Sequence, residues 1–335
     1  MALRIGILAA ARIANAAVIT PARLVPGVRV TAIAARDPAR ARAFAQEHGL
    51  PGVAASYQDL VARDDVDLVY VASPPALHAA HARLAIDAGK PVLLEKPSAA
   101  NAAETRAIVD HARARNVRLI EAFHYRHHPV FVRVLDILRR GEIGTLTRGS
   151  AVFNANIRTD PDEIRWRADL GGGALMDLGC YCVHWLRHAA KSQAAPGAGE
   201  PALTGVEARV DKAPSGVDVT TEARLQFGTS FEAIVQTSMQ PADGVRRAAL
   251  RLEGTDGSLE VTNPLAPQFG HDIALTRAGK THHESLTMDA TFTFQLAAVK
   301  HALASGDALP TEGEDMIANM ETIDAIYRAG GFVRG

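Results

Sequence analysis

The chain has 335 residues, of which 47% are hydrophobic and 22% charged, and its formal net charge at pH 7 is -1. These values are ordinary for a globular protein, and the length suggests about two domains. A nearly neutral chain lacks the basic surface that nucleic acid or an anionic membrane would require, so we expect neither as a partner.

The first part of the chain alternates short apolar runs with helical segments. Buried strands are expected at 4–9, 28–34, 68–72, 91–94 and 118–122, with helices at 38–48, 77–89 and 101–116. Continuous apolar strands separated by helices are typical of a parallel sheet that helices cover on both faces. We therefore predict a doubly wound α/β domain over residues 1–122.

The pattern changes after about residue 123. Helices are expected at 129–140 and 173–190, a surface loop at 191–201, and strands at 220–227 and 231–237. The strands alternate apolar and polar residues, which is typical of antiparallel strands with one half-solvated face. We predict an α+β domain over residues 123–335 with a mainly antiparallel sheet, and a last helix at 315–327 that can pack back on the first domain.

The segment from Gly6 to Ala14 lies where the first expected strand meets a helix. A phosphate-binding turn needs small residues there, because the backbone must approach the pyrophosphate in front of the helix N–H groups. Alanines stand where the dinucleotide fingerprint has glycines, and they keep the small size but lose the freedom to adopt a positive φ. A plain strand-to-helix turn is the alternative. The expected cofactor contacts are Ala9, Ala11, Arg12 and Ile13.

The end of the second expected strand bears on the choice between NAD and NADP. NAD enzymes commonly carry an acid there for the ribose hydroxyls, whereas this chain has Ala35. Arg36 can stack on adenine or pair with a 2′-phosphate, and Arg40 can add a second contact. The alternatives are two solvated arginines at a helix start, or an Asp37 that turns inward. We predict NADP, with NAD as the alternative.

Lysine is scarce, with six residues in the chain, whereas arginine is used freely for surface charge. Lys96 follows the expected strand at 91–94, at the carboxyl end of the sheet, where ligands bind in open α/β domains. Pro97 restricts the chain direction after it. We therefore expect Lys96 in the active site.

Four polar residues share one face of the expected helix at 173–190 if it turns by ~100° per residue: Asp177, Tyr181, His184 and His188. A solvated face usually carries Lys, Glu or Arg, so this composition favours a cleft wall, with a solvated stripe as the alternative. A hydride leaves a carbinol carbon only as the hydroxyl proton is removed, and Tyr181 is the candidate base. Its phenol, which titrates near ~10 when unperturbed, would need a cation such as Lys96 nearby.

The two cysteines, Cys180 and Cys182, lie on the same expected helix. They are too close together to join distant parts of the fold, and residues two apart on a helix point away from one another. With His184 and His188 they therefore do not form a zinc site. We expect no disulfide, no metal and, without a secretory core or ~18 consecutive apolar residues, a cytoplasmic protein.

Three motifs in combination resemble the glucose-fructose oxidoreductase and inositol dehydrogenase family, often called Gfo/Idh/MocA. They are the alanine turn, Glu95-Lys96-Pro97, and the run from Gly171 to Tyr181. In detail, the turn and the Asp-Leu-Gly-Cys-Tyr run resemble the branch of dimeric dihydrodiol dehydrogenases and NADP-dependent xylose dehydrogenases. The resemblance implies a Rossmann-type first domain, and a second domain whose large open sheet forms homo-oligomers, either dimers or tetramers.

The resemblance also implies residue roles. The lysine matching Lys96 orients nicotinamide and the substrate oxygen, the acid matching Asp177 holds substrate, and the residue matching Tyr181 relays the proton. Further cofactor contacts are implied for Ser73, Pro74, His78, Glu95, Lys96, Trp166 and Arg167, although Trp166 can instead be an aromatic packed under a loop. Further substrate contacts are implied for Tyr125, Arg126, Arg165 and His184, although His184 can instead be hydrogen-bonded in place. Pro75 departs from the asparagine usual in the family.

These observations predict an NAD(P)-dependent dehydrogenase or reductase. It would transfer a hydride between nicotinamide C4 and a carbinol or carbonyl carbon of a small molecule: a sugar, a polyol, or a small dihydrodiol or dicarbonyl. The alternative is a catalytically silent dinucleotide-binding regulator or sensor of the same fold. Such a protein is expected to have lost Lys96, Asp177 or Tyr181, and all three are present.

Overall fold

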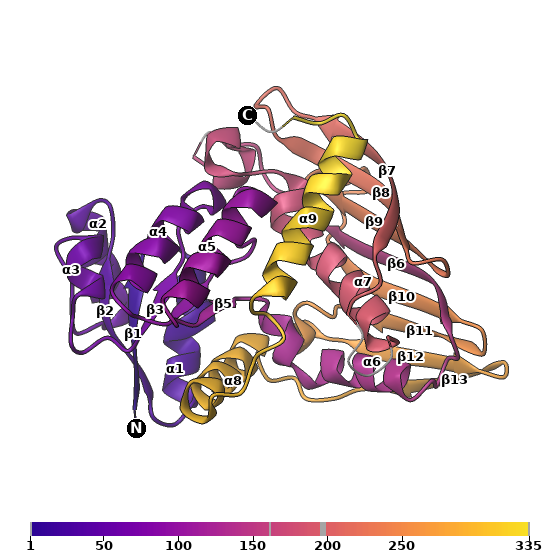
Figure 1. Cartoon of the computed structure of the whole chain (residues 1–335), viewed down its shortest axis with the longest axis horizontal. Coiled ribbons are helices and arrows are strands. Elements are labelled where there is room, and N and C mark those ends of the chain that lie inside the picture. Colours follow the sequence, from indigo (N-terminus) through magenta and orange to yellow (C-terminus); the bar gives the residue numbers. More distant parts are fainter. Residues whose placement is uncertain (1, 161, 195–198, 334–335) are drawn as a thin grey trace. The chain divides into compact units, whose positions relative to one another are not determined.

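The computed structural model describes residues 2–160, 162–194 and 199–333. Internal contacts group the chain into two units. The first unit is Met1–Arg126 with Phe292–Met320, and the second is His127–Thr291 with Glu321–Gly335. Each unit thus combines an earlier stretch of chain with a later one. Figure 1 labels their helices and strands.

The first unit is built on a five-stranded parallel sheet with the order β2-β1-β3-β4-β5. The strands are β1 (Leu3–Leu8), β2 (Val28–Ala34), β3 (Leu68–Val71), β4 (Val92–Leu94) and β5 (Leu119–Glu121). Most of their side chains are buried, in two apolar clusters. The predicted doubly wound α/β fold is confirmed, with each expected strand in place to within two residues.

The helical segments of the first unit are η1 (Asn15–Ile19), α1 (Thr20–Leu24), α2 (Pro38–His48), α3 (Tyr57–Val61), α4 (Pro75–Asp87), α5 (Ala102–Ala114), η2 (His124–His127) and nearly all of α8 (Thr291–Ser305). Three of them, α2, α4 and α5, were predicted. The Asn101 side chain caps α5 by accepting the Glu104 N–H at 2.9 Å, as in a capping box. The sequence pattern did not predict α8, whose Leu296 and Val299 are buried in the same core as β1.

The second unit contains an eight-stranded sheet with the order β13-β12-β11-β10-β6-β9-β8-β7. The strands are β6 (Leu146–Asn154), β7 (Leu203–Lys212), β8 (Asp218–Phe227), β9 (Phe231–Ser238), β10 (Arg247–Gly254), β11 (Gly257–Thr262), β12 (Asp272–Arg277) and β13 (Lys280–Glu284). Neighbours are antiparallel except for β6 and β9. The predicted mainly antiparallel sheet is confirmed.

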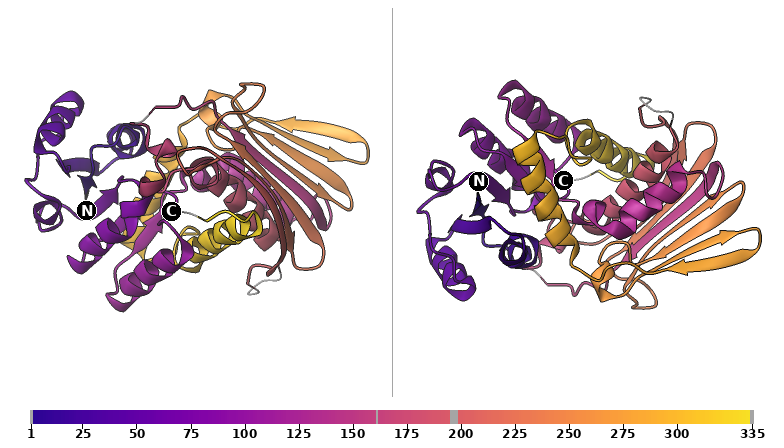
Figure 2. Two further views of the ribbon diagram at one scale, coloured as in Figure 1. Left: turned by 90° about the horizontal axis from the view of Figure 1, so that it is seen from above. Right: turned by 90° about the horizontal axis from the view of Figure 1, so that it is seen from below.

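The helical segments of the second unit are α6 (Pro129–Arg139), η3 (Ile164–Trp166), η4 (Ala168–Leu170), η5 (Leu175–Gly179), α7 (Cys180–Ser192), η6 (Pro267–Phe269) and the later part of α9 (Glu314–Ala329). Helix α7 packs on β6 and β9, and α6 packs on α7. In the described part of the chain, helices cover one face of the sheet and leave the other open (Figure 2). The loop expected at 191–201 begins later, after Ser192, and its residues 195–198 lie outside the described residues.

Within the described ranges, none of the helices combines the length and the apolar character that crossing a membrane demands.

Candidate active site

The turn after β1 adopts the backbone shape of a dinucleotide fingerprint with alanine in place of glycine. Ala9 has φ +87°, and its N–H donates to the Ala34 carbonyl at 2.9 Å. The expectation that alanine would forgo a positive φ here is therefore wrong. A side chain in this region costs of order 1–2 kcal/mol, and pairing with β2 holds Ala9 in place against that cost. Arg12 and Ile13 are exposed at the same turn.

The end of β2 resolves one alternative from the sequence. The Asp37 carboxylate caps α2, since Oδ1 accepts the Ala39 N–H at 2.8 Å, so this acid does not turn inward. The Arg40 guanidinium donates to the Ala10 carbonyl of the alanine turn at 3.1 Å. Arg36 is exposed. The carboxyl end of β2 therefore presents arginine rather than a carboxylate.

Tyr57, at the start of α3, lies beside these arginines and was not identified from the sequence. Burial raises the pKa of Tyr57, while a hydrogen bond from the Arg36 backbone and the charges of Arg36 and Arg40 oppose that rise. No motif surrounds Tyr57, and it follows β2 by more than twenty residues. Only the folded structure shows that Tyr57 lies beside Arg36 and Arg40.

Ser73 follows β3 at the same edge of the sheet. Its hydroxyl is buried and has no hydrogen-bond partner in the described part of the chain. Buried hydroxyls are nearly always paired, and an unpaired one is costly. An unused hydrogen-bonding position beside Pro74, at the edge where open α/β sheets bind ligands, fits a bound dinucleotide.

Lys96 lies two residues after the end of β4, and a buried carboxylate holds its backbone. Glu95 Oε1 accepts the Tyr70 hydroxyl at 2.6 Å, and Oε2 accepts the Lys96 N–H at 3.3 Å. Lys96 is half-buried, whereas Glu95 is 8% exposed. Glu95, expected at the cofactor, thus also serves as a link between β3 and the Lys96 backbone.

His78, on α4, is buried between two backbone carbonyls. Its Nδ1 lies 2.8 Å from the Pro97 carbonyl oxygen, and its Nε2 lies 2.6 Å from that of Ser73. Both ring nitrogens thus lie at backbone carbonyls, which leaves neither of them for a polar contact with a cofactor. Burial lowers the pKa of His78 to about 4. The ring is therefore neutral at pH 7 and donates to one of the two carbonyls.

The low pKa of His78 leads us to expect that the stability of the fold depends on pH. Because the pKa of His78 is about 4 in the folded chain and about 6.5 when unfolded, the unfolded chain binds the extra proton first as pH falls. The stability contributed by the neutral ring is present above pH 6.5 and is lost toward pH 4, by about 3 kcal/mol in all. We expect urea unfolding at pH 7 and pH 4.5 to show a steeper loss for the wild type than for His78→Asn. Parallel pH curves would contradict this expectation.

Two further predicted substrate residues of the first unit lie in η2. Tyr125 is fully buried, and its ring meets the Phe123 ring at a centroid distance of 6.2 Å. Arg126 is half-buried.

In the second unit, Arg165 holds Asp177. Its Nε donates to Asp177 Oδ2 at 2.6 Å, and an Nη donates to Glu163 Oε1 at 2.9 Å. The Asp177 carboxylate, joined by that of Glu163, raises the pKa of Arg165. A charge-assisted pair of this kind fixes the orientation of the Asp177 carboxylate. Arg165, predicted to bind substrate, therefore has a role toward Asp177 as well.

Trp166 and Arg167 follow on the same segment. Trp166 is buried, and its indole N–H donates to the Arg158 carbonyl at 3.0 Å. This matches the alternative of an aromatic side chain packed under a loop. Arg167 is exposed and forms two hydrogen bonds with Asp169, of 2.8 and 2.5 Å.

The helix that carries Asp177 and Tyr181 begins with a π-helical turn, η5, before continuing as α7. A π turn holds more residues than the 3.6 of an α-helix, and such turns are frequent at functional sites. The assumed 100° per residue therefore fails between Asp177 and Tyr181. The Tyr181 ring is 6% exposed and packs edge-on against Phe153, with 5.9 Å between centroids. The alternative of a solvated stripe is wrong, because residues 180–190 are all buried.

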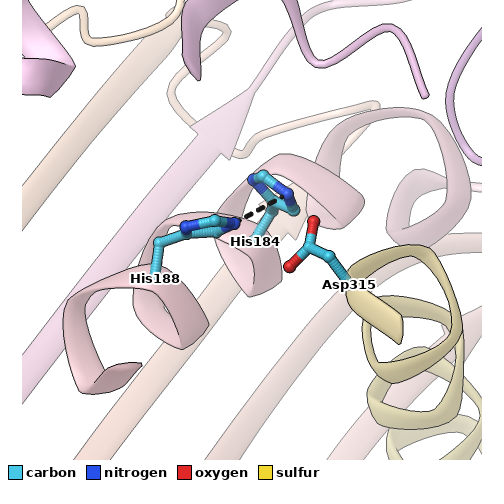
Figure 3. A group of neighbouring side chains, drawn as sticks. All are labelled: His184, His188 and Asp315. Atoms are coloured by element: carbon cyan, nitrogen blue, oxygen red, sulfur yellow. Dashed lines mark hydrogen bonds between the residues drawn. The ribbon is translucent and has the colours of Figure 1, made fainter. Parts of the chain in front are cut away.

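His184 and His188 form a buried pair one turn apart on α7 (Figure 3). Their Nε2 atoms are 3.1 Å apart and their ring centroids 4.2 Å apart. One ring donates and the other accepts, so at least one of the two is neutral. Asp315, labelled in the same figure, belongs to the first unit. The absence of a metal site stays a prediction.

Asp218 anchors the start of the Asp177 helix, although the sequence did not single it out. The fully buried carboxylate accepts the Leu175 N–H at 2.8 Å and the hydroxyls of Thr221 and Tyr327 at 2.8 and 2.7 Å. Burial raises the pKa of Asp218, and these donors oppose the rise. Gly173, with φ +124°, approaches so closely that a Cβ would lie 2.1 Å from Asp218 Oδ1. A side chain at position 173 would thus collide with the Asp218 carboxylate, so the third residue of the Gly-Gly-Gly run must be glycine.

Comparison with known proteins agrees with this arrangement. Residues 3–123 match the model of an oxidoreductase family with an NAD-binding Rossmann fold, Gfo/Idh/MocA, and residues 131–260 match the C-terminal domain model of the same family. A solved 3-ketoreductase from Actinomadura kijaniata, in complex with NADP and TDP-benzene, superposes with a TM-score of 0.86 at 28% identity, covering 98% of each chain.

Two curated relatives cover much of the chain. D-xylose 1-dehydrogenase (NADP(+)) 2 of Haloferax volcanii is 33% identical over 332 residues, which is 97% of this chain and 96% of that protein. Trans-1,2-dihydrobenzene-1,2-diol dehydrogenase of Xenopus laevis is 35% identical over 244 residues, 72% of this chain and 71% of that protein. Both are of the branch that the motifs indicated. The chain belongs to the Gfo/Idh/MocA oxidoreductase family.

Proposed function

We propose that this oxidoreductase uses NADP to interconvert a carbinol and a carbonyl group on a sugar, a polyol, or a small dihydrodiol or dicarbonyl. Relatives that are named for xylose and for a dihydrobenzenediol support this substrate class, as does a 3-ketoreductase complexed with NADP. The observation that carries the proposal is Lys96, placed two residues after β4 at the carboxyl edge of the sheet and held there through Glu95.

Three residues would carry out the chemistry. The Lys96 ammonium would stabilise the substrate oxygen and orient the nicotinamide, and Asp177, held by Arg165, would anchor a second substrate hydroxyl. In the oxidative direction Tyr181 Oη would accept the hydroxyl proton, and in the reductive direction it would return that proton. Bound NADP or NADPH supplies the other half of the reaction, by accepting or donating a hydride at nicotinamide C4.

The cofactor would be held at the carboxyl edge of the first unit. The alanine turn from Ala9 to Ile13 would face the pyrophosphate, and the unused Ser73 hydroxyl would bond to the dinucleotide. Arg36 and Arg40 would pair with the 2′-phosphate, beside Tyr57. His78 is left out of this set because its ring nitrogens are both at backbone carbonyls. Direct contacts from Pro74, Glu95, Trp166 and Arg167 stay predictions.

The arginines at the end of β2 predict a preference for NADPH. Asp37 is occupied as a helix cap, so no carboxylate is available there to favour the ribose hydroxyls of NADH. Fluorescence titration should give a Kd for NADPH at least roughly 10-fold lower than for NADH, one good charge-assisted contact being worth that much. Arg36→Ala should remove most of the difference, whereas Arg29→Ala, at the other end of β2, should not. Tighter binding of NADH would overturn the proposal.

A substrate panel tests turnover itself. Purified protein with NADP or NADPH should act on at least one compound among aldoses, polyols, vicinal dihydrodiols and dicarbonyls. Protein that binds NADPH but acts on none of them would support the catalytically silent regulator instead.

We also propose that the protein is a homo-oligomer, a dimer or tetramer, formed through the open face of the eight-stranded sheet. Apolar side chains on its central strands are half-exposed there, among them Val152 and its direct neighbour Ala249. Light scattering after gel filtration should give a multiple of 35.6 kDa for the wild type and a lower mass for Ala249→Glu. Met288→Asp, at an exposed apolar residue outside the sheet, should leave the mass unchanged. A monomeric wild type would refute the assembly.

We also propose a cytoplasmic location, which fits a chain whose two cysteines, Cys180 and Cys182, are not joined in a disulfide.

A further inference from the structure

We propose that His78 is a positioning residue for Lys96: its ring ties the segment that carries Lys96 to helix α4. The inference rests on the proposed catalytic role of Lys96. His78 is buried, and the proposed role requires no contact with the dinucleotide or the substrate.

The ring lies where the sheet no longer holds the two segments together. Strands β3 and β4 pair up to Val71 and Leu94, and the last ladder bond runs from the Glu95 N–H to the Val71 carbonyl at 3.0 Å. Beyond that bond the two chains continue as Ser73 and as Lys96-Pro97. His78 stands between them, with one ring nitrogen at each carbonyl. The neutral ring has a single N–H, which we place on Nδ1, so that beyond the end of the ladder the ring donates to the Pro97 carbonyl beside Lys96.

The burial of the ring supports a tether rather than a ligand contact. His78 is 1% exposed, and its two nitrogens are 2.8 and 2.6 Å from carbonyl oxygens of the chain. It is carried by α4, a helix of 13 residues that begins two residues after Ser73, so its position does not depend on the segment that carries Lys96. A rigid helix that holds a loop by a buried side chain is a common way to fix functional geometry.

Lys96 is the residue most affected by this tether, because Pro97 is its direct neighbour. A lysine side chain is a flexible stem, so the backbone position determines where the ammonium can reach. Displacement of a catalytic group by 1 Å can cost roughly 100-fold in rate. Loss of the tether should therefore lower kcat far more than it weakens binding of NADPH.

The two ring nitrogens can be separated by substitution. Asparagine offers an amide nitrogen near the position of Nδ1, which lies at Pro97, and glutamine offers one near Nε2, which lies at Ser73. Because Pro97 adjoins Lys96, we expect kcat to fall in the order wild type, His78→Asn, His78→Gln, His78→Ala. The alanine variant should lose roughly 10- to 100-fold in kcat, with the Kd for NADPH changed by less than about threefold.

Hydrogen–deuterium exchange of the ligand-free protein provides a readout that does not depend on turnover. His78→Ala should speed exchange in peptides covering residues 95–101, and His78→Asn should restore most of the protection. His111→Ala serves as the control, because His111 is in the same unit and bonds to the Asp87 side chain. It should change neither kcat nor exchange at 95–101.

Failure of this inference can be told from failure of the proposed function. Unchanged exchange at 95–101 in all three His78 variants, or equal losses of kcat for Asn, Gln and Ala, would overturn the tether. If exchange behaved as expected while Lys96→Met kept full activity, the tether would stand and the catalytic role of Lys96 would be wrong. Should His78→Ala fail to fold, the comparison of His78→Asn with His78→Gln decides.

Discussion

Replacing Lys96 with methionine should lower kcat by roughly 1,000-fold or more, the range in which loss of a positioned acid–base or electrostatic group falls. Methionine keeps most of the length and the apolar stem of lysine but removes the ammonium group. Because Glu95 accepts a hydrogen bond from the Lys96 backbone N–H, which the substitution leaves in place, the turn after β4 should keep its shape. The loss is therefore expected in the chemical step and not in folding.

Steady-state kinetics on a substrate identified by the panel, with NADPH titration of the same preparation, would measure this effect. The Kd for NADPH should stay within about threefold of the wild type, since the proposed pyrophosphate and ribose contacts lie at other residues. Lys280→Met, at an exposed residue of β13, provides the control and should behave as wild type. A Lys96→Met enzyme that keeps a tenth of its kcat would show that the mechanism is wrong.

Replacing Asp218 with alanine should lower the free energy of unfolding by about 3–5 kcal/mol. The change leaves three buried donors without their acceptor, the Leu175 N–H and the hydroxyls of Thr221 and Tyr327, and each buried orphan costs about 1–3 kcal/mol. Asp218→Asn should cost only about 1 kcal/mol, because the amide oxygen can accept from Leu175 and Thr221 while its N–H faces the Tyr327 hydroxyl.

Urea unfolding at pH 7 gives these energies directly, and kcat measured below the transition gives the effect on the Asp177 helix. Asp211→Ala, at an exposed aspartate of the neighbouring strand β7, should be nearly neutral and controls for loss of a carboxylate. Equal destabilisation by Asp211→Ala and Asp218→Ala would show that the hydrogen-bond network around Asp218 does not stabilise the fold.

The sequence predicted those parts of the fold that depend on local pattern. Strands β1 to β5 are apolar on both faces and are separated by helices with caps such as Asn101, so their positions follow from composition along the chain. Lys96 follows from the same logic, since the carboxyl end of a parallel strand is recognisable without coordinates. The run from Gly171 to Tyr181, which resembles a family motif, then indicated Asp177 and Tyr181 as further site residues.

Other features depend on contacts between distant residues. Asp218 lies 43 residues from Leu175 and 109 from Tyr327, and no local pattern links these positions. The π turn η5 shifts Asp177 relative to Tyr181, and an assumed 3.6 residues per turn cannot show such a shift. His78 resembled a ligand residue because its position is near the cofactor motif, whereas its true partners are two backbone carbonyls. Every residue has a backbone carbonyl, so the sequence does not show which carbonyls will lie beside a histidine ring.

Neither unit is continuous in sequence, and this affects how the chain must form during synthesis. The first unit includes residues 292–320. Within it, the Arg118 side chain, next to β5, donates to the backbone carbonyls of Ala302 and Asp307 and to the Glu312 carboxylate. The second needs Tyr327, which pairs with Asp218. At about 5–20 residues per second, the ribosome takes roughly 10 to 40 seconds to pass from 126 to 320. The nascent Rossmann unit therefore has an uncovered edge beside β5 until residues 292–320 have been translated.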